Sequence, residues 1–409
     1  THTAVEHKKL LLNFPQTQGL GYAWTSRAHV EIEDTSTVSE DSVVINSVLA
    51  GNVVVNSRTV VSHCHLNGHI IVGKDSILSS LNVETSKNKS KGIVFPDSMV
   101  IQGFNIHLNT LGMTRSMITV HGRHDDTQAP NWKTMSTFCN QPWLLMLNRT
   151  GIAKEELWSS DVDSNEQTIH TAKLFPFFHI SENVGLKEVL WLMGATDDDE
   201  DKTILKRWRA SWRVSLSDIL SNVDVGAEFA WKRKLYFEVG ELQLKRTLIT
   251  QGHQGFCSLF NSASIEDYSN SVLQTLDKVA SETSSPGIAA RTLANIADVL
   301  GGMAGTKGGL RSGPAGNVAW RKAFSYLEAG NFPHGVVAMA KEREKWMGRP
   351  DLLIRAARHY EGAAQILIRQ AVMTARKFFS TGEGTLPLMN KWVQADCPAR
   401  IDISGGWSD

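Results

Sequence analysis

The sequence predicts an α+β protein of several domains, in which a parallel β-helix is followed by an α-helical domain. Two observations predict this fold class. Aliphatic residues recur at every sixth position in the first third of the chain, and the apolar period becomes helical in the middle. The chain has 409 residues, which is enough for two or three domains with cores of their own.

The overall composition argues against several classes of partner. Lys plus Arg and Asp plus Glu both number 42, so the formal net charge is zero and neither nucleic acid nor a membrane surface is an expected partner. No apolar run is long enough for a transmembrane helix. The first residues, THTAVEHKK, are polar and begin with Thr1 rather than Met, so we expect a chain that starts inside a longer protein and carries no signal peptide.

The cysteines indicate a reducing compartment. The four cysteines are Cys64, Cys139, Cys257 and Cys397. They lie far apart in the sequence and form no C-x-x-C pair. This spacing is typical of a cytoplasmic protein without disulfides. We therefore expect the protein to be cytoplasmic.

The six-residue period is the clearest pattern in the chain and predicts a β-helix over residues 31–135, of the left-handed hexapeptide type. Gly, Asn and Ser stand between the aliphatic residues of this period, and a polar insertion, ETSKNKSKG, precedes the last three of them. The aliphatic residues are Val48, Val54, Val60, Leu66, Val72, Leu78, Val94, Val100 and Ile106. With three equal sides per coil, each residue would lie over the residue 18 positions later. The predicted interior ladders therefore pair Val48 with Leu66, Val54 with Val72, and Val60 with Leu78.

The β-helix alone leaves the function open. Hexapeptide β-helices occur in acyltransferases and in scaffolds joined to sugar nucleotidyltransferases. A non-catalytic scaffold that holds subunits of a homo-oligomer together is therefore one alternative for this chain.

A cluster of possible zinc ligands, SHCHLNGH, lies inside the repeat. Alternation along a strand places Cys64 inward with Leu66, and His63 and His65 outward, while His69 falls on the next side of the coil. These side chains cannot converge on one ion, so we predict no metal site here.

The middle of the chain, residues 136–390, predicts an α-helical domain. In ILKRWRASWRVSLSDIL the large apolar residues share one face of a single expected helix, at Leu205, Trp208, Trp212, Leu216 and Ile219. The arginines between them would allow bases to stack on tryptophan. The zero net charge favours an amphipathic core helix instead.

Farther along, Ser285 and Pro286 mark the start of another helix.

A glycine-rich stretch, GGMAGTKGGLRSGPAGN, covers residues 301–317. Backbone amides beside Lys307 could hold an anion, with Gly308, Gly309, Arg311 and Ser312 as the candidate residues. No strand precedes this stretch, and it lacks the G-x-x-x-x-G-K-[ST] order of a P-loop. An ordered loop between two helices is the favoured interpretation.

The last residues, CPARIDISGGWSD, predict a strand that ends at a sugar site. Gly405 permits a sharp bend, Trp407 offers a flat apolar face for a sugar ring, and the Asp409 carboxylate can accept hydrogen bonds from hydroxyl groups. Arg400 supplies the fixed positive charge that phosphoryl transfer requires. A buried strand followed by a turn is the alternative.

This terminal stretch resembles the first motif of the GHMP small-molecule kinases, in the form found in L-fucose kinases. Several other stretches look like parts of animal L-fucose kinases in the same order, namely SHCHLNGHIIVG, KLFPFFH, RASWR, GGLRSGPAGN and RAARHYEGAAQILIRQAV. The resemblance implies four parts: the tail of a nucleotidyltransferase-like domain (1–30), a β-helix (31–135), a helical linker (136–390) and the opening of a GHMP kinase domain (391–409).

The same resemblance implies an activity. L-fucose kinases transfer the γ-phosphate of ATP, with Mg²⁺, to the anomeric hydroxyl of L-fucose, and the fucose-1-phosphate enters GDP-fucose salvage. It also implies that Arg400 is a catalytic residue near the transferred phosphate and that Gly405, Trp407 and Asp409 bind the sugar. Trp407 stands where galactokinases carry histidine, so that contact must differ.

The phosphate loop P-x-x-x-G-L-x-S-S of the family does not occur in this sequence. We therefore expect a fragment that is inactive as a kinase by itself. The alternative is a fucose-1-phosphate guanylyltransferase, in which the β-helix half serves nucleotidyl transfer.

Overall fold

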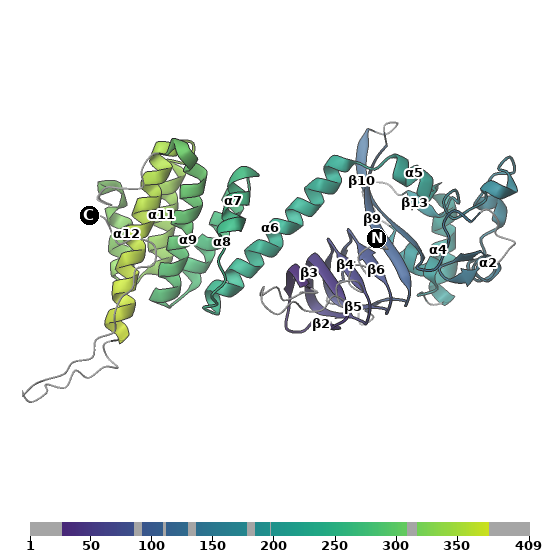
Figure 1. The fold of residues 1–409 in the computed structure, drawn as a ribbon, viewed down its shortest axis with the longest axis horizontal. Coiled ribbons are helices and arrows are strands. Elements are labelled where there is room, and N and C mark those ends of the chain that lie inside the picture. Colours follow the sequence, from purple (N-terminus) through teal and green to yellow (C-terminus); the bar gives the residue numbers. More distant parts are fainter. Residues whose placement is uncertain are drawn as a thin grey trace, which may run out of the picture.

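A computed structural model describes residues 27–85, 92–108, 112–129, 136–177, 185–196, 198–308 and 317–375. It contains a β-solenoid followed by a helical region, which confirms this part of the predicted fold class. One long helix, α6 (Val225–Ile249), connects the two (Figure 1). The expected kinase strand and the expected upstream tail before Arg27 lie outside the described residues.

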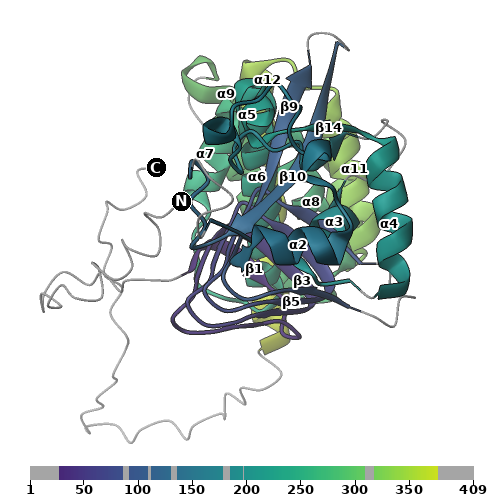
Figure 2. The same ribbon diagram turned by 90° about the vertical axis from the view of Figure 1, so that its right-hand side faces the viewer.

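The solenoid is built from parallel strands that pair in register with strands one coil away. They are β1 (Arg27–Ile32), β2 (Thr37–Val38), β3 (Val43–Val55), β4 (Val60–Ser62), β5 (His65–Val72), β6 (Ile77–Ser79), β7 (Asn82–Glu84) and β8 (Ile93–Phe95). Figure 2 looks along the stack, so that the coils lie one behind another. The solenoid ends in a long antiparallel hairpin, β9 (Met99–Leu108) and β10 (Met113–Gly122), whose first strand pairs with β6.

The coils repeat every 17 residues rather than the predicted 18, except the coil with the polar insertion, where Ile70 pairs with Ile93. Val48 pairs with His65 and His65 with Asn82, and Asn52 lies 17 positions before its neighbour His69. The reason is the spacing of the corners. Residues with positive φ mark them and recur at intervals of 5, 7 and 5 positions, at Asn46, Gly51, Arg58, His63, Gly68, Asp75 and Ser80. The sides are therefore unequal.

The predicted ladder pairs are wrong by one position as a result. The interior ladders are Val44–Val61–Leu78–Ile101, Leu49–Leu66–Val83 and Val55–Val72–Phe95, and every side chain in them is at most 2% exposed. Leu66, Val72 and Leu78 thus point inward as predicted. Val48 and Val60 are buried on the outside of the coils, Val48 against α6 and Val60 against Ile77 and Val100.

A mixed α and β segment follows the hairpin and extends the solenoid core. Its elements are β11 (Thr137–Phe138), β12 (Gln141–Pro142), α2 (Trp143–Thr150), β13 (Phe175–Phe177), α3 (Leu186–Met193), α4 (Asp198–Ala210), β14 (Trp212–Val214) and α5 (Leu216–Ser221). The buried side chains of Trp143, Trp191 and Trp208 belong to the same apolar core as the solenoid ladders. This end of the solenoid is therefore covered rather than open to water.

The single helix predicted around Trp208 and Trp212 is wrong. The chain leaves the helix at Ser211, and Trp212 starts β14, which pairs with β13. Ser215 then begins α5 by accepting a hydrogen bond from the backbone N–H of Asp218. Trp212 is consequently 55% exposed, whereas Trp208 is fully buried.

The helical region packs around one apolar core of its own. Its helices are α7 (Cys257–Ile265), α8 (Ser269–Glu282), α9 (Pro286–Ala304), α10 (Arg321–Glu328), α11 (Phe332–Glu344) and α12 (Pro350–Ala375). Pro286 occupies the first turn of α9 and Ser285 caps it, as predicted. None of the helices described is long and apolar enough to cross a membrane.

Helix α6 lies along the column of corners formed by His29, Asn46 and His63. His29 Nε2 lies 2.7 Å from the carbonyl of Tyr236, and the Asn46 amide donates to the carbonyl of Lys232 at 3.0 Å. One helical turn rises by about 5.4 Å and neighbouring strands lie about 4.8 Å apart, so successive turns of α6 can meet successive coils.

Candidate functional site

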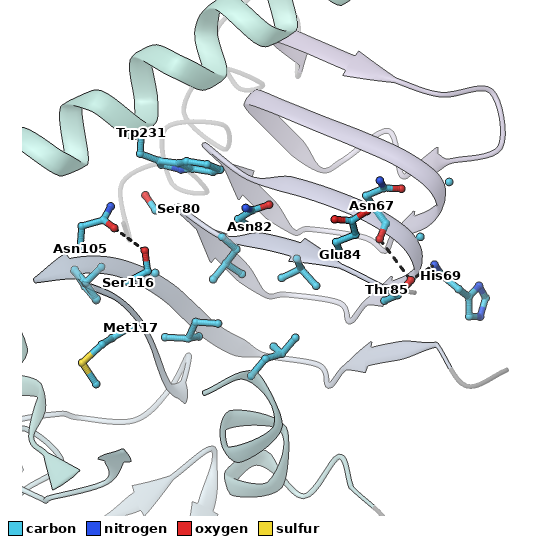
Figure 3. Close-up of a pocket in the computed structure, with 18 of the residues that line it drawn as sticks. Asn67, His69, Ser80, Asn82, Glu84, Thr85, Asn105, Ser116, Met117 and Trp231 are labelled. Carbon is cyan, nitrogen blue, oxygen red and sulfur yellow. Dashed lines mark hydrogen bonds between the residues drawn. The ribbon is translucent and has the colours of Figure 1, made fainter. Parts of the chain in front are cut away.

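A groove of about 1300 Å³ lies where the β9–β10 hairpin leaves the last coil. One wall comes from β5 and β7, and the other from β9 and β10. Ala227 and Trp231 of α6 and Leu186 of α3 also line the groove, as do Glu33, Thr35, Gly51 and Asn52 of the earlier coils. The groove therefore joins three parts of the chain that are far apart in the sequence (Figure 3).

Trp231 is the aromatic residue that α6 contributes to the groove. Figure 3 shows it projecting from the helix over the strand that carries Asn82. Its indole N–H donates to the His63 carbonyl at 3.0 Å, so the ring orientation is fixed. The ring is half-buried, which leaves part of its apolar surface toward the groove.

Amides and hydroxyl groups line the wall of coils and the hairpin. Asn67 and Glu84 are register partners on β5 and β7, so their side chains share a face. Across the groove, the Ser116 hydroxyl donates to the Asn105 amide oxygen at 2.6 Å, and Asn105 Nδ2 donates to Glu228 of α6 at 3.2 Å. The hairpin wall is thus held by its own contacts.

Three polar side chains of the other wall have no such contacts. In the described part of the chain, the side chains of Asn67, Asn82 and Glu84 make no hydrogen bond with protein groups, and Asn82 and Glu84 are exposed. Their donors and acceptors face water and are available to a ligand. The arrangement is suited to binding a polar molecule with an apolar face.

The titratable side chains of the described groove lining are those of Glu33, Glu84 and His69. Its one imidazole, His69, lies with Nδ1 at 3.0 Å from Asn52 Nδ2 and is exposed. Its lining includes no cysteine, and among the described residues no group of three His, Cys, Asp or Glu side chains could hold a metal ion.

The possible zinc ligands of the sequence are kept apart by the coil. Cys64 points into the core, as predicted, where burial raises the pKa of its thiol to about 12. His63 occupies a corner beside Ser62, and burial, followed by the charge of Lys232, lowers its imidazole pKa. His65 lies 3.4 Å from the Glu238 carboxylate on α6. His63 and His65 connect the solenoid to α6.

The other predicted site residues fall mostly outside the described residues. This applies to Arg400, Gly405, Trp407 and Asp409, and to Gly309, Arg311 and Ser312 of the glycine-rich stretch. Gly308 is buried against α12, where an added Cβ would lie 3.2 Å from Ile354 Cβ. Lys307 is exposed and ends a short 3₁₀ helix after α9.

The sequence analysis missed the groove because its residues carry no local motif. Trp231 stands in AEFAWKRKLYFEVG, where apolar residues lie on all sides of the helix. That pattern has a cause in the structure. Leu235 and Val239 pack on the solenoid, whereas Phe237 and Leu244 pack in the helical region. The sequence signal was a helix whose apolar residues lie on all of its sides. Such a helix is expected to pack against more than one neighbouring part of the protein.

Comparisons with known proteins point to fucose metabolism. Residues 5–180 match the model of the fucose pyrophosphorylase domain. The chain is also 29% identical over 192 residues to a bifunctional fucokinase/GDP-fucose pyrophosphorylase of Arabidopsis thaliana. The aligned region covers 46% of this chain and 17% of that protein. No solved structure matches the chain. The chain therefore spans a small part of the length of its relative, and its solenoid half is similar to fucose pyrophosphorylase domains.

Proposed function

We propose that this chain is part of an enzyme that activates L-fucose, and that its solenoid belongs to the half that makes GDP-fucose from fucose-1-phosphate and GTP. One observation carries the proposal. The match to the fucose pyrophosphorylase domain, residues 5–180, includes the whole solenoid and the β9–β10 hairpin. The kinase-related stretch at the end of the sequence lies outside that match.

The described residues fit a supporting role in that reaction. Nucleotidyl transfer needs groups that hold a triphosphate and its metal ion. The solenoid groove has no lysine or arginine in its described lining. We therefore propose that the reaction takes place elsewhere in the polypeptide that carries this sequence. In this proposal the solenoid is a structural support for the part that carries out the reaction.

A second activity, phosphorylation of L-fucose by Mg-ATP, is proposed for the same polypeptide. Two observations favour it. The matched relative is named for both activities. The terminal stretch CPARIDISGGWSD also resembles a GHMP kinase motif. In this proposal Arg400 lies near the transferred phosphate, while Gly405, Trp407 and Asp409 contact the sugar.

A feeding experiment tests both activities in the protein as it exists. Cells that lack the gene for this chain are given isotopically labelled L-fucose, and labelled fucose, fucose-1-phosphate and GDP-fucose are measured by mass spectrometry. Loss of labelled GDP-fucose with accumulation of fucose-1-phosphate is expected if the pyrophosphorylase step is lost. Loss of both products indicates that the kinase step is also lost. Unchanged labelled GDP-fucose would contradict the proposal, and re-expression of the gene is the control.

A further inference from the structure

We infer that the groove between the solenoid and Trp231 binds a neutral oligosaccharide, at a site separate from the one where a sugar is phosphorylated or joined to a nucleotide. The inference rests on the charge, the shape and the chemical groups of the lining. It goes beyond the proposed reaction, because the ligand carries no phosphate and undergoes no chemistry there.

The charge of the described groove lining disfavours the phosphorylated compounds of the proposed reaction. Its described lining contains the carboxylates of Glu33 and Glu84 and no lysine or arginine. The Glu33 carboxylate accepts a hydrogen bond from the Gly51 backbone N–H at 2.7 Å, so this amide is not free to hold a phosphate. An anion in the groove would meet like charge without a compensating cation. We therefore assign a neutral ligand to the groove.

The lining combines flat apolar surface with amides, and this combination suits a sugar ring. One face of a pyranose is lined by C–H groups and its edge carries hydroxyl groups. The half-buried Trp231 ring and the side chains of Phe104 and Ile118 supply apolar surface. Asn67 and Asn82 each offer both a donor and an acceptor, which matches a hydroxyl group that does both.

The volume favours more than one sugar ring. At about 1300 Å³ the groove exceeds the range of roughly 300–1,000 Å³ that is common for sites of small molecules. The polar groups are also spread along it, from Asn52 and His69 on the coils to Asn105 and Ser116 at the hairpin. A chain of two or three sugars would reach both ends, whereas a monosaccharide would contact one.

The test is titration calorimetry of the 409-residue chain with two neutral trisaccharides, 2′-fucosyllactose and maltotriose. GDP and fucose-1-phosphate serve as the anionic probes. Binding of at least one neutral probe is expected. Asn82→Ala should weaken it by roughly three- to tenfold, the value of one or two neutral hydrogen bonds. Asn270→Ala is the matched control, because Asn270 is an exposed asparagine on α8 in the helical region.

Two further variants make the result specific. Trp231→Phe keeps a ring but shortens the apolar face, so the neutral probe should bind more weakly while circular dichroism remains native. Glu155→Gln removes a negative charge from the exposed surface outside the groove and should leave affinity for the neutral probe unchanged. The inference is overturned if no neutral probe binds, if Asn82→Ala binds as the unmodified chain does, or if GDP binds and Trp231→Phe abolishes that binding. The feeding experiment gives its answer independently of these outcomes.

Discussion

The indole nitrogen of Trp231 lies 3.0 Å from the carbonyl oxygen of His63, although the two residues are 168 positions apart in the sequence. This hydrogen bond joins the first half of α6 to a corner of the solenoid. It also sets the angle at which the indole ring faces the groove. Local stability and ligand binding therefore depend on the same side chain.

Replacing Trp231 by phenylalanine should lower the free energy of unfolding by about 1 kcal/mol, because the His63 carbonyl loses its donor. Urea unfolding followed by circular dichroism measures the change. Trp212→Phe is the control, since Trp212 is 55% exposed on β14. Equal effects of the two substitutions would mean that the Trp231 hydrogen bond contributes nothing.

Gly51→Ala should destabilise the solenoid by about 1–3 kcal/mol. Gly51 has φ +79°, which side chains rarely adopt, and an added Cβ would lie 2.8 Å from Gly68 Cα in the next coil. Differential scanning calorimetry should show a lower Tm. Gly255→Ala is the matched control, because an added Cβ there meets nothing within 4 Å. A Tm for Gly51→Ala equal to that of the control would contradict the close packing of the coils.

Asp75 should make stability depend on pH. Arg58, one coil earlier, donates to both Asp75 oxygens at 2.7 and 2.6 Å and holds the carboxyl pKa below its usual value, and Arg123 adds to the effect. Because the folded pKa is depressed, the contribution is present above the unfolded pKa of about 3.9 and is lost as the pH falls through the folded pKa.

The measurement compares the chain with Asp75→Asn by urea unfolding at several pH values. The difference in free energy of unfolding should be constant near neutral pH and should shrink below about pH 4. Asp161→Asn is a control for a carboxyl whose pKa is lowered only by neighbouring hydrogen bonds, without an arginine partner. A difference for Asp75→Asn that does not vary with pH would show that the ion pair adds nothing.

The helical region should depend strongly on the buried pair of Arg343 and Asp277. Arg343 donates to both Asp277 oxygens, at 3.0 and 2.6 Å, and to the Tyr360 hydroxyl at 3.0 Å. Burial alone would lower the pKa of Arg343, but the Tyr360 and Asp277 oxygens offset burial and raise it. Arg343→Met should cost about 3 kcal/mol, because it leaves the Asp277 carboxylate, whose side chain is only 19% exposed, without its partner.

Arg349→Met is the matched control for this substitution. Arg349 also pairs with a carboxylate, Asp351, at 3.0 Å, but both side chains are more than half exposed. Its replacement should leave guanidinium unfolding almost unchanged. The double variant Arg343→Met, Asp277→Leu should recover part of the loss, since no charge is then left buried. If the double variant is less stable than Arg343→Met, the buried carboxylate is not the cause.

The sequence predicted the solenoid because its apolar pattern is local. Leu66, Val72 and Leu78 point inward in the structure as the six-residue period required. The length of a coil could not be predicted from the six-residue period. The shorter sides depend on left-handed backbone conformations at Asn46, Gly51 and His63, and only the glycine of these three residue types announces such a conformation reliably.

The groove could not be predicted because its walls come together only after folding. Trp231 and Asn82 have no sequence relationship, and each alone is an ordinary helix or strand residue. The break at Ser211 was missed for a related reason. Pairing of β14 with β13, a tertiary interaction, outweighs the helical spacing of Trp208 and Trp212.

Helix α6 is packed on the solenoid through Leu235 and Val239 and in the helical region through Phe237 and Leu244. Its length in residues therefore fixes the mutual orientation of the two bodies. Inserting or deleting a single residue near its middle would rotate one body about the helix axis by about 100° and shift it by about 1.5 Å. We therefore expect α6 to tolerate substitutions at its exposed positions better than changes in its length.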